Sequence, residues 1–448
     1  MDETRKPRLR QVDRTTVVPA IVLDKLVGPN HPVRAIWDYV SVIDLTPLLD
    51  TIRALEGVPG RNATDPKILL ALWMWATSDG IGTARAVDLL CREHNAYRWL
   101  AGGVSLNYHT LASFRSTHEA QLDGFLEQHV SALLHQGLID LSCVAQDGMR
   151  TRASAGSGSF RRTVSIEECH KLVKEQIALL KRQEEEPLDA VSRRQLAAQQ
   201  RHAKERLERL TKAKQAAEEL GAKQAERVRL HPKEAEQRGT KDKPARGSTT
   251  DPDARRMKMA DGGTRPGYNV QCATTVDSGI IVGVAVTNQG SDGGLMGEML
   301  DQIEEAYEKK PESYLVDGGF SSKADVENAH ARGIVVYAPL KNEKEELAAC
   351  KDPYSAKAGD KAGMKALRAR MGTKEAKELY KKRSSTAEWV NAGMRLRGLY
   401  QLTVRGLSKV RAVVVLQALV HNLWQTIRML TKTKQEWNWT EILRAEVA

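Results

Sequence analysis

The sequence predicts an α/β fold, in which a mixed sheet carries an inserted helical hairpin and follows an all-helical N-terminal domain. Three observations predict it. Apolar residues in the first third of the chain recur at helical spacing between short turns. From residue 139 onward, short apolar runs typical of strands alternate with helical runs. A long polar segment with leucines at helical spacing separates the first of these runs from the others.

The helical N-terminal domain is predicted to comprise residues 1–138. Asp65 and Pro66 have the chemistry of an N-cap and a first helical position, so a helix should begin there. A second helix is predicted after Thr83, and a third over residues 110–134.

Basic side chains lie near the ends of these predicted helices, and His109 and Arg115 are the candidates for contacting DNA. Three helices joined by glycine-bearing turns resemble a helix-turn-helix reader of DNA. A helical packing domain without a DNA contact explains the same pattern, so both interpretations stay open.

The sheet domain is predicted to comprise residues 139–163 and 247–448. Its first strand should cover 139–146 and end at Asp147-Gly148, and a later hairpin should turn at Asp277-Ser278-Gly279. The order of elements combines an antiparallel part with a parallel part, which is compatible with a ribonuclease-H-like fold. The predicted elements after the first strand are strands 268–276 and 280–287, helix 293–309, strand 314–316, helix 323–332 and strand 334–337.

The polar segment 164–246 predicts two amphipathic helices broken near Pro187, inserted into the sheet domain. Residues 239–250 are rich in Lys, Arg, Gly, Ser and Pro, which predicts a flexible return to the core. The insertion is interpreted as a dimer contact, a DNA clamp or simply a solvated helical excursion.

Composition limits the possible functions. The formal net charge of +11 on 448 residues favours a polyanionic partner, with nucleic acid ahead of a membrane surface. Five cysteines, odd in number and without a CxxC pair, indicate neither a disulfide framework nor a structural zinc site, and the adjacent Cys169 and His170 fit an ordinary helix. A cytoplasmic, nucleoid-associated protein is therefore expected. The apolar run 410–430 contains several polar residues, which predicts a core helix with a structural His421 rather than a membrane span.

Three carboxylates are the candidates for catalysis and for binding metal ions. Asp147 and Asp317 each follow a short apolar run and precede a glycine, so a turn can expose both where central strands end. Glu388 follows Ser384-Ser385-Thr386, which are N-cap candidates, and shares a helical face with Asn391, Ala392 and Arg395. Two-metal phosphoryl transfer needs about three such carboxylates close together, because Mg²⁺ prefers oxygen ligands.

Several motifs together resemble the DDE transposases of bacterial insertion sequences, especially the group named insertion sequence eleven-eighty-two, which is related to the groups named insertion sequence four and five. The resemblance covers nearly the whole chain. The motifs that carry it are HPVRAIW at 31–37, YRWL at 97–100, YHTL at 108–111, VAQDGMR at 144–150, RPGYNVQ at 265–271, VDGGF at 316–320, AEWVNA at 387–392, RGL at 405–407 and HNL at 421–423.

The resemblance implies that Asp147, Asp317 and Glu388 are the catalytic metal ligands and that they hold two Mg²⁺ or Mn²⁺ ions. Tyr380 and Arg383 match the first positions of a Tyr, Arg, Glu, Lys signature around the glutamate and are implied to contact DNA. One extra residue separates Arg383 from Glu388, and Arg395 stands where lysine is usual, although arginine also binds phosphate. The implied partners are terminal inverted repeats and target DNA, bound by a homodimer.

Two other functions remain open from the sequence. A nuclease could use the same carboxylates for hydrolysis alone, and it would cut DNA without joining ends. A DNA-binding protein derived from a transposase could retain the three acidic residues without catalysis.

Overall fold

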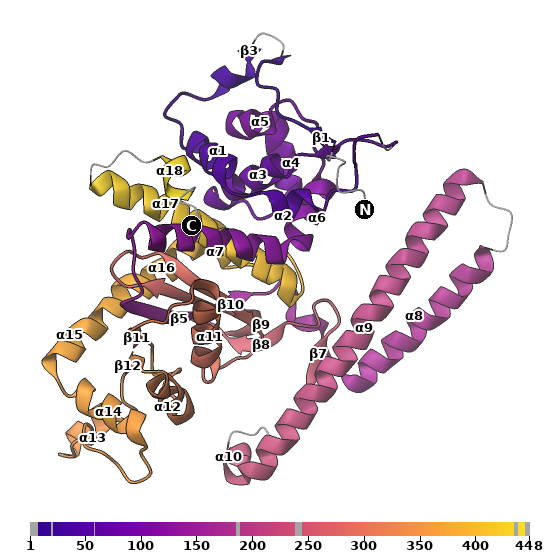
Figure 1. The fold of residues 1–448 in the computed structure, drawn as a ribbon. Coiled ribbons are helices and arrows are strands. Elements are labelled where there is room, and N and C mark those ends of the chain that lie inside the picture. Colours follow the sequence, from indigo (N-terminus) through magenta and orange to yellow (C-terminus); the bar gives the residue numbers. More distant parts are fainter. Residues whose placement is uncertain are drawn as a thin grey trace.

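The computed structural model describes residues 8–18, 21–57, 59–184, 189–237, 244–433 and 438–443. Its N-terminal part is mostly helical and packs on one side of a central sheet (Figure 1). Short strands tie the first residues to this part: β1 pairs with β4 in parallel, and β2 pairs with β3. The elements are β1 (Leu9–Arg10), β2 (Val17–Val18), β3 (Ile21–Val22), the 3-10 helix η1 (Leu23–Leu26), α1 (Pro32–Val42), α2 (Thr46–Leu49), β4 (Ala63–Thr64), α3 (Pro66–Ser78), α4 (Ala84–Glu93), α5 (Asn95–Ala101), α6 (Tyr108–Thr117) and α7 (Glu119–His135).

Two of the predicted helix starts are confirmed by their caps. The Asp65 carboxylate accepts the Lys67 N–H at 2.9 Å at the start of α3, and the Thr83 hydroxyl accepts the Ala86 N–H at 3.2 Å at the start of α4. The single helix predicted over 110–134 is wrong, since α6 and α7 are separated at His118, whose φ of −117° and ψ of 41° are not helical. The helix α5 was not predicted.

The central sheet is mixed and has the strand order β10-β9-β5-β11-β12, with β8 paired to β9. β5, β9 and β10 are antiparallel neighbours, whereas β11 and β12 continue the sheet in parallel with β5. The predicted hairpin, the helices after it and the two later strands are confirmed within a few residues at each end. The bounds are β5 (Cys143–Arg152), β8 (Arg255–Lys258), β9 (Thr264–Thr275), β10 (Ile281–Thr287), α11 (Leu295–Tyr307), β11 (Ser313–Leu315), α12 (Lys323–Ala331) and β12 (Val335–Tyr337).

The first strand of the sheet differs from its prediction. β5 begins at Cys143 and continues through Asp147 to Arg152, so Asp147 lies inside the strand and not at its end. The reason is tertiary, because β9 pairs with β5 along the whole stretch from Val144↔Thr275 to Arg152↔Gly267.

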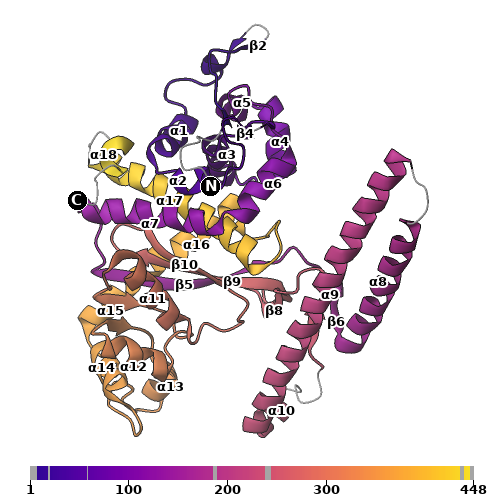
Figure 2. The same ribbon diagram turned by 45° about the vertical axis from the view of Figure 1, so that its right-hand side comes forward.

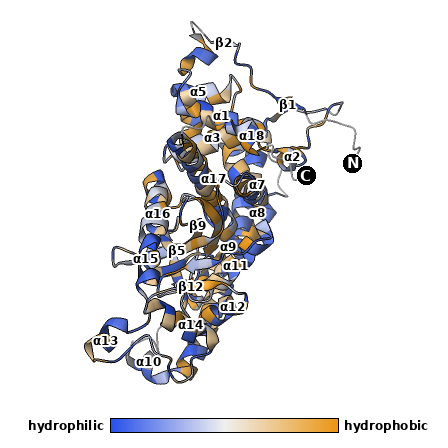
Figure 3. Cartoon of the chain, turned by 60° about the vertical axis from the view of Figure 1, so that its left-hand side comes forward, coloured by the Kyte–Doolittle hydropathy of each residue, from blue (hydrophilic) through white to orange (hydrophobic). Residues whose placement is uncertain are grey.

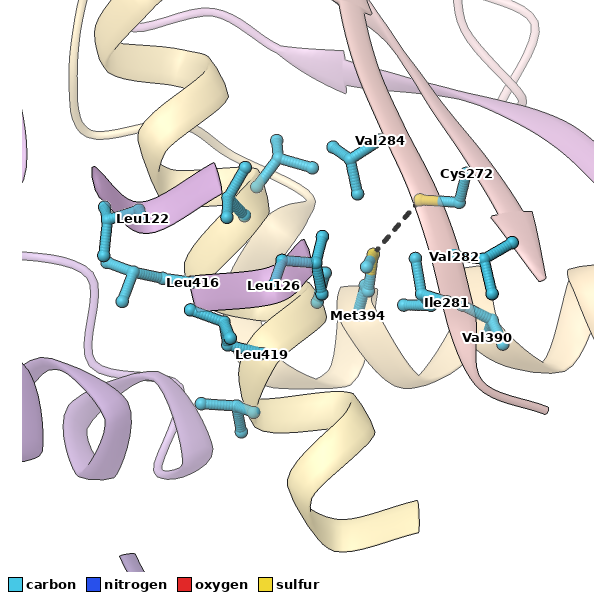
Figure 4. Close-up of a cluster of buried hydrophobic side chains, with 14 of the residues drawn as sticks. Leu122, Leu126, Cys272, Ile281, Val282, Val284, Val390, Met394, Leu416 and Leu419 are labelled. Atoms are coloured by element: carbon cyan, nitrogen blue, oxygen red, sulfur yellow. Dashed lines mark hydrogen bonds between the residues drawn. The ribbon is translucent and has the colours of Figure 1, made fainter. Parts of the chain in front are cut away.

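Helices cover both faces of the sheet, and the apolar core runs through the sheet into the N-terminal helices without a break. On one face, side chains of α7, α16 (Trp389–Met394) and α17 (Leu407–Lys432) pack against β9 and β10; the Cys272 thiol approaches the Met394 sulfur at 3.9 Å (Figure 4). On the other face lies α11. Figure 3 shows the apolar residues gathered where β9 runs between these layers.

The helix α17 joins the N-terminal helices to the sheet. His421 is buried and contacts the Gly279 carbonyl oxygen at 2.8 Å, which confirms its predicted structural place. Asn422 accepts the Ile281 N–H and donates to the Ile281 carbonyl, both at 2.8 Å. Burial lowers the pKa of His421 to about 4, so the ring is neutral where it meets the hairpin turn.

The insertion is a long helical hairpin that extends to one side of the sheet (Figure 2). α8 (Thr163–Gln183) packs along α9 (Ala190–Leu230), and leucine, valine and alanine side chains fill the seam between them. The predicted break near Pro187 lies outside the described residues. Of the stretch predicted as a flexible return, residues 246–248 instead form a strand, because they pair with the strand that precedes α8. These elements are η2 (Ser157–Ser159), β6 (Phe160–Arg162), α10 (Pro232–Gln237) and β7 (Arg246–Ser248).

The C-terminal third places helices on two sides of the sheet: those of residues 323–383 lie below and beside it, whereas α17 and the last helix lie next to the N-terminal helices (Figure 1). A helical run with two π-helical stretches continues from α15 to Leu399, although Arg397 and Gly398 leave helical conformation, and α17 begins at Leu407. Within the described residues, no helix combines the length and the hydropathy that crossing a membrane requires. The remaining elements are α13 (Glu343–Ala348), α14 (Ala362–Met371), α15 (Lys374–Arg383), the π-helices η3 (Ser384–Glu388) and η4 (Arg395–Leu399), and α18 (Trp439–Leu443).

Candidate active site

Strand register places Asp147 and Asp317 side by side. β11 runs parallel to β5, and its last residue, Leu315, is the register partner of Ala145. Asp147 and Asp317 each come two residues later, and neighbouring strands lie about 4.8 Å apart. The Asp317 carboxylate also accepts the Gly319 N–H at 2.7 Å, which holds it in the turn that ends the strand. The two acids therefore meet where the parallel pairing stops.

Glu388 reaches the same region from a widened helical turn. It is the last residue of η3, and Ala387 beside it packs with Ala145 and Leu315 on the face of the sheet that carries Asp147. The predicted N-cap role of Ser384-Ser385-Thr386 is wrong, because the helix continues through these residues from α15. Their hydroxyls donate to carbonyls one turn earlier, the Thr386 hydroxyl to Lys382 O at 2.8 Å, and such bonds fit a distorted turn.

Arg383 joins two of the three carboxylates. One guanidinium nitrogen lies 3.4 Å from Asp147 Oδ1, and the other lies 3.3 Å from Glu388 Oε1. Asn391, one turn after Glu388, donates from Nδ2 to Asp147 Oδ2 at 2.9 Å. The Arg383 and Asp147 side chains are 13% and 15% exposed, whereas Glu388 is 55% exposed. The site thus has a largely buried aspartate, which accepts hydrogen bonds from Asn391 and from the Gly148 N–H and forms an ion pair with Arg383, and a glutamate open to solvent.

Charges within the site act on Asp147 and on Arg383. Burial raises the pKa of Asp147, and the negative charges of Asp317 and Glu388 raise it further, against the opposing effects of Arg383 and the Gly148 N–H. Burial lowers the pKa of Arg383, but Tyr380, Asp147 and Asp317 more than offset this, so its pKa is raised overall. Asp317 and Glu388 are therefore both close enough to disfavour the charge on Asp147.

A buried polar network supports the site from the opposite face of the sheet. The Tyr314 hydroxyl donates to Gln146 Oε1 at 2.9 Å, and Gln146 Nε2 donates to Gln271 Oε1 at 3.1 Å. Gln271 and Asn269 then donate to the same oxygen of Asp292, at 3.0 and 2.7 Å. Neighbouring strands are thus joined by hydrogen bonds in a region from which water is excluded, which makes their relative position rigid.

Asp292 links this network to the segments that carry Asp147 and Asp317. Its second oxygen pairs with Arg150 of β5 at 2.9 Å. A Cβ added at Gly148 would lie 2.7 Å from Asp292 Oδ1, and one added at Gly319 would lie 3.4 Å from Asp292 Oδ2 and 3.0 Å from Asp317 Oδ1. Asp292 therefore packs against residues that follow the two candidate aspartates, and only glycine leaves room for it at position 148.

The donor set at this site has the chemistry that divalent cations prefer, namely carboxylate oxygens with excess negative charge. Within the described ranges, no three His, Cys, Asp or Glu side chains are grouped closely enough to hold a metal ion as they stand. Instead, the Arg383 guanidinium supplies the positive charge between Asp147 and Glu388. The carboxylate oxygens are suitable ligands for a divalent cation. Arg383 must move away from Asp147 and Glu388 before these two side chains can bind the same ion.

The other residues predicted to contact DNA lie in different environments. Tyr380 is half-buried, with its ring centroid 5.9 Å from the Arg383 guanidinium carbon. His109 and Arg395 are exposed. Arg115 is buried, donates to the Gly82 carbonyl at 2.8 Å and lies over the Trp73 ring, and burial lowers its pKa to about 10. This placement gives Arg115 a packing role and does not favour a DNA contact.

Sequence reasoning missed Asp292, Arg150 and the amides of the polar network as parts of the site. A signal was present, because Asn269 and Gln271 occupy alternate positions of an apolar strand and so share one buried face. Buried amides of this kind need partners. The Ser-Asp-Gly-Gly sequence around Asp292 has the composition of a simple turn, and nothing local distinguishes it from one.

A mixed sheet that brings two aspartates and a helical glutamate to one edge defines a carboxylate site of the kind used in phosphoryl transfer. Comparison with protein families then gives two matches: residues 234–423 match the transposase DDE domain, and residues 21–117 match a transposase domain described as DUF772. These matches support a DDE transposase of insertion sequences. They include Asp317 and Glu388 but not Asp147. Curated proteins and solved structures gave no match.

Proposed function

We propose that this protein is a DNA transposase that cleaves the ends of an insertion sequence and joins them to target DNA, with Asp147, Asp317 and Glu388 as its catalytic residues. The observation that carries the proposal is the Arg383 guanidinium held between Asp147 and Glu388 at the end of the β5–β11 pairing, where the strand register brings Asp317 next to Asp147. The antiparallel and parallel parts of the sheet support a ribonuclease-H-like catalytic domain made of residues 139–163 and 247–448. The motifs of the sequence support a member of the insertion sequence eleven-eighty-two group.

The proposed chemistry is in-line attack of water or a DNA 3′-hydroxyl on phosphorus. Asp147, Asp317 and Glu388 would hold two Mg²⁺ or Mn²⁺ ions, which would activate the attacking oxygen and stabilise the leaving one. Asn391 orients Asp147 by donating from Nδ2 to Asp147 Oδ2. Arg383 neutralises Asp147 and Glu388 in this structure, and its planar fork can bind a phosphate oxygen pair when DNA is present. Tyr380 and the exposed Arg395 and His109 remain proposed DNA contacts.

The test is an end-cleavage and strand-transfer assay with Mg²⁺ on DNA that carries the element's terminal repeats. Each of Asp147→Asn, Asp317→Asn and Glu388→Gln should lower the single-turnover rate by about 100-fold or more, since a ligand to the ions contributes several kcal/mol to transition-state stabilisation. Glu378→Gln is the matched control, because this glutamate is exposed on α15 and pairs only with Lys381 in the described structure. An unchanged rate in any of the first three variants would remove that residue from the site.

The same assay separates the alternatives. A hydrolytic nuclease would nick the DNA and never yield joined products, and a non-catalytic DNA-binding relative would bind ends without cutting them. The helical domain 1–138 is proposed to bind the ends, and a homodimer is proposed because two ends must be held together. Light scattering on the protein–DNA complex tests the dimer, and a mass equal to one chain with two ends would contradict it.

A further inference from the structure

A cleft of about 940 Å³ lies where the insertion joins the sheet, and its lining does not include Asp147, Asp317 or Glu388. We call it the insertion cleft. Its walls come from α9, the β6–β7 pair, β8 and the loop after β10. The lining residues whose charge or shape matters are Phe160, Arg162, Glu219, Lys223, Arg246, Arg255, Arg256 and Gly290.

The insertion cleft is strongly basic. Its lining contains the side chains of five cations and a single carboxylate, Glu219. Arg162, Lys223, Arg246 and Arg256 are exposed, and none of them forms an ion pair with any residue that the structure describes. Long cationic side chains on a folded surface are commonly balanced by nearby acids, and these are not. The cleft therefore presents uncompensated positive charge to solvent.

Two of these cations are placed where folding alone would disfavour them. Arg162 of β6 and Arg246 of β7 are direct register partners in an antiparallel pair. Like charges directly opposite each other in such a pair are destabilising. Repulsion of this kind is relieved when an anion lies between the two guanidinium groups, which points to an anionic partner in the cleft.

The cleft is also rigid at its base. A Cβ at Gly247 would collide with the Ala213 carbonyl oxygen, so β7 lies directly against the backbone of α9. The Ser159 and Ser248 hydroxyls bond to each other at 2.8 Å and close the β6–β7 pair. Arg255 is held by the Pro252 carbonyl at 2.6 Å. The charged side chains thus project from a fixed frame, and a rigid frame lowers the entropy cost of binding.

One loop connects the cleft to the candidate active site. Gly290 lines the cleft, and its carbonyl accepts a hydrogen bond from Arg150 at 3.1 Å. The same guanidinium nitrogen of Arg150 pairs with Asp292, the anchor of the polar network beside the catalytic aspartates. A partner bound in the cleft therefore contacts the loop that supports the site.

We propose that the insertion cleft binds the phosphate backbone of duplex DNA, and this proposal rests on the function proposed above. Cations that meet no acid are the groups that neutralise phosphates and release counterions. Sites for single strands stack bases on aromatic side chains, whereas the one aromatic residue of the lining, Phe160, is buried. The charge and the lack of a stacking surface in this lining therefore favour the duplex. Interactions of this kind fix the position of DNA without reading its sequence.

The experiment measures DNA affinity of the full chain against salt concentration, without divalent metal, by fluorescence anisotropy of a labelled duplex. The triple variant Arg162→Gln, Arg246→Gln, Arg256→Gln should bind more weakly, and the slope of log affinity on log salt should fall by about 0.9 for each phosphate that is no longer neutralised. Both the loss of affinity and the decrease in slope should be equal for a terminal-repeat duplex and for an unrelated duplex. The matched control is Lys171→Gln, Lys174→Gln, Arg206→Gln, which removes three exposed cations of the insertion outside the cleft lining.

The folding of the triple variant is checked by thermal unfolding, and its midpoint should equal or exceed that of the wild type because a like-charge pair is removed. A salt slope equal to that of the wild type, or one lowered as much by the control, would overturn the proposal. So would a loss of affinity for single strands with duplex affinity unchanged. Since no cleavage is involved, the two proposals can fail separately. A wild-type protein that neither cuts nor joins DNA, together with a lowered salt slope in the triple variant, would refute the proposed function and leave the cleft proposal intact.

Discussion

Replacing Asp292 by asparagine tests whether the polar network supports the fold as its geometry indicates. The change keeps the shape of the side chain and an oxygen for Asn269 and Gln271, but it removes the charge that faces Arg150 at 2.9 Å. Breaking a buried ion pair by neutralising one partner costs about 3–5 kcal/mol. Because the Arg150 side chain is 26% exposed and that of Asp292 is 10% exposed, we expect a loss at the lower end, about 3 kcal/mol.

The same strand offers a matched control. Arg152, two residues further along β5, pairs with Asp261 at the same 2.9 Å, but their side chains are 42% and 43% exposed. Exposed pairs contribute about 0–1 kcal/mol, so Arg152→Gln, which leaves Asp261 paired with Arg265 at 2.6 Å, should change stability by no more than that. The assay is urea denaturation followed by tryptophan fluorescence, which yields the free energy of unfolding of each variant. Equal losses in the two variants, or a loss below about 1 kcal/mol for Asp292→Asn, would refute the assignment of a structural network at this position.

Two further predictions concern Asn391 and His421. Asn391→Ala removes the donor to Asp147 and should weaken the apparent metal affinity, measured by single-turnover cleavage, by about 10–100-fold. DNA binding should stay unchanged. The same metal dependence in the variant and the wild type would contradict the positioning role of Asn391. The pKa of His421 is about 4 when folded against an ordinary 6.5, so the unfolded chain binds the proton first as pH falls. Its contribution to stability is therefore complete above pH 6.5 and is lost progressively toward pH 4, by about 3 kcal/mol in total. Denaturation midpoints measured at several pH values should show this loss of stability. His421→Gln keeps a donor for the Gly279 carbonyl but does not titrate, so its stability should depend less on pH. Equal pH dependence in the variant and the wild type would contradict the prediction.

Local chemistry explains the parts of the fold that were predicted correctly. The Asp277-Ser278-Gly279 turn between two β-rich runs predicted the β9–β10 hairpin, and Asp65 with Pro66 predicted the start of α3. Caps, turns and hydrophobic periodicity act over a few residues, so they can be recognised without knowledge of the fold. One error arose because a distant segment overrides the local pattern: β5 continues past Asp147 because β9 pairs with it. Another error was local, since the helix α15 runs directly into Ser384, where a new helix start was predicted.

The candidate residues and the site they form have different origins. Motifs in the sequence singled out Asp147, Asp317 and Glu388, and the positive charge pointed to a polyanion. Their relation to one another depends on the parallel register of β11 on β5 and on the packing of η3 over that edge. The ion pair of Arg383 with Asp147, the burial of Arg115 and the position of Asp292 likewise depend on contacts between segments that are far apart in the sequence.

The sequence by itself determined the local elements, the inserted hairpin and the residue types able to carry out phosphoryl transfer. Tertiary structure alone decided which of those residues are neighbours, which arginines are free to meet an anion and which are packed inside. The physical reason is that contacts between residues hundreds of positions apart, such as Asn391 with Asp147, depend on the closure of the whole sheet and leave no mark on the sequence around either residue.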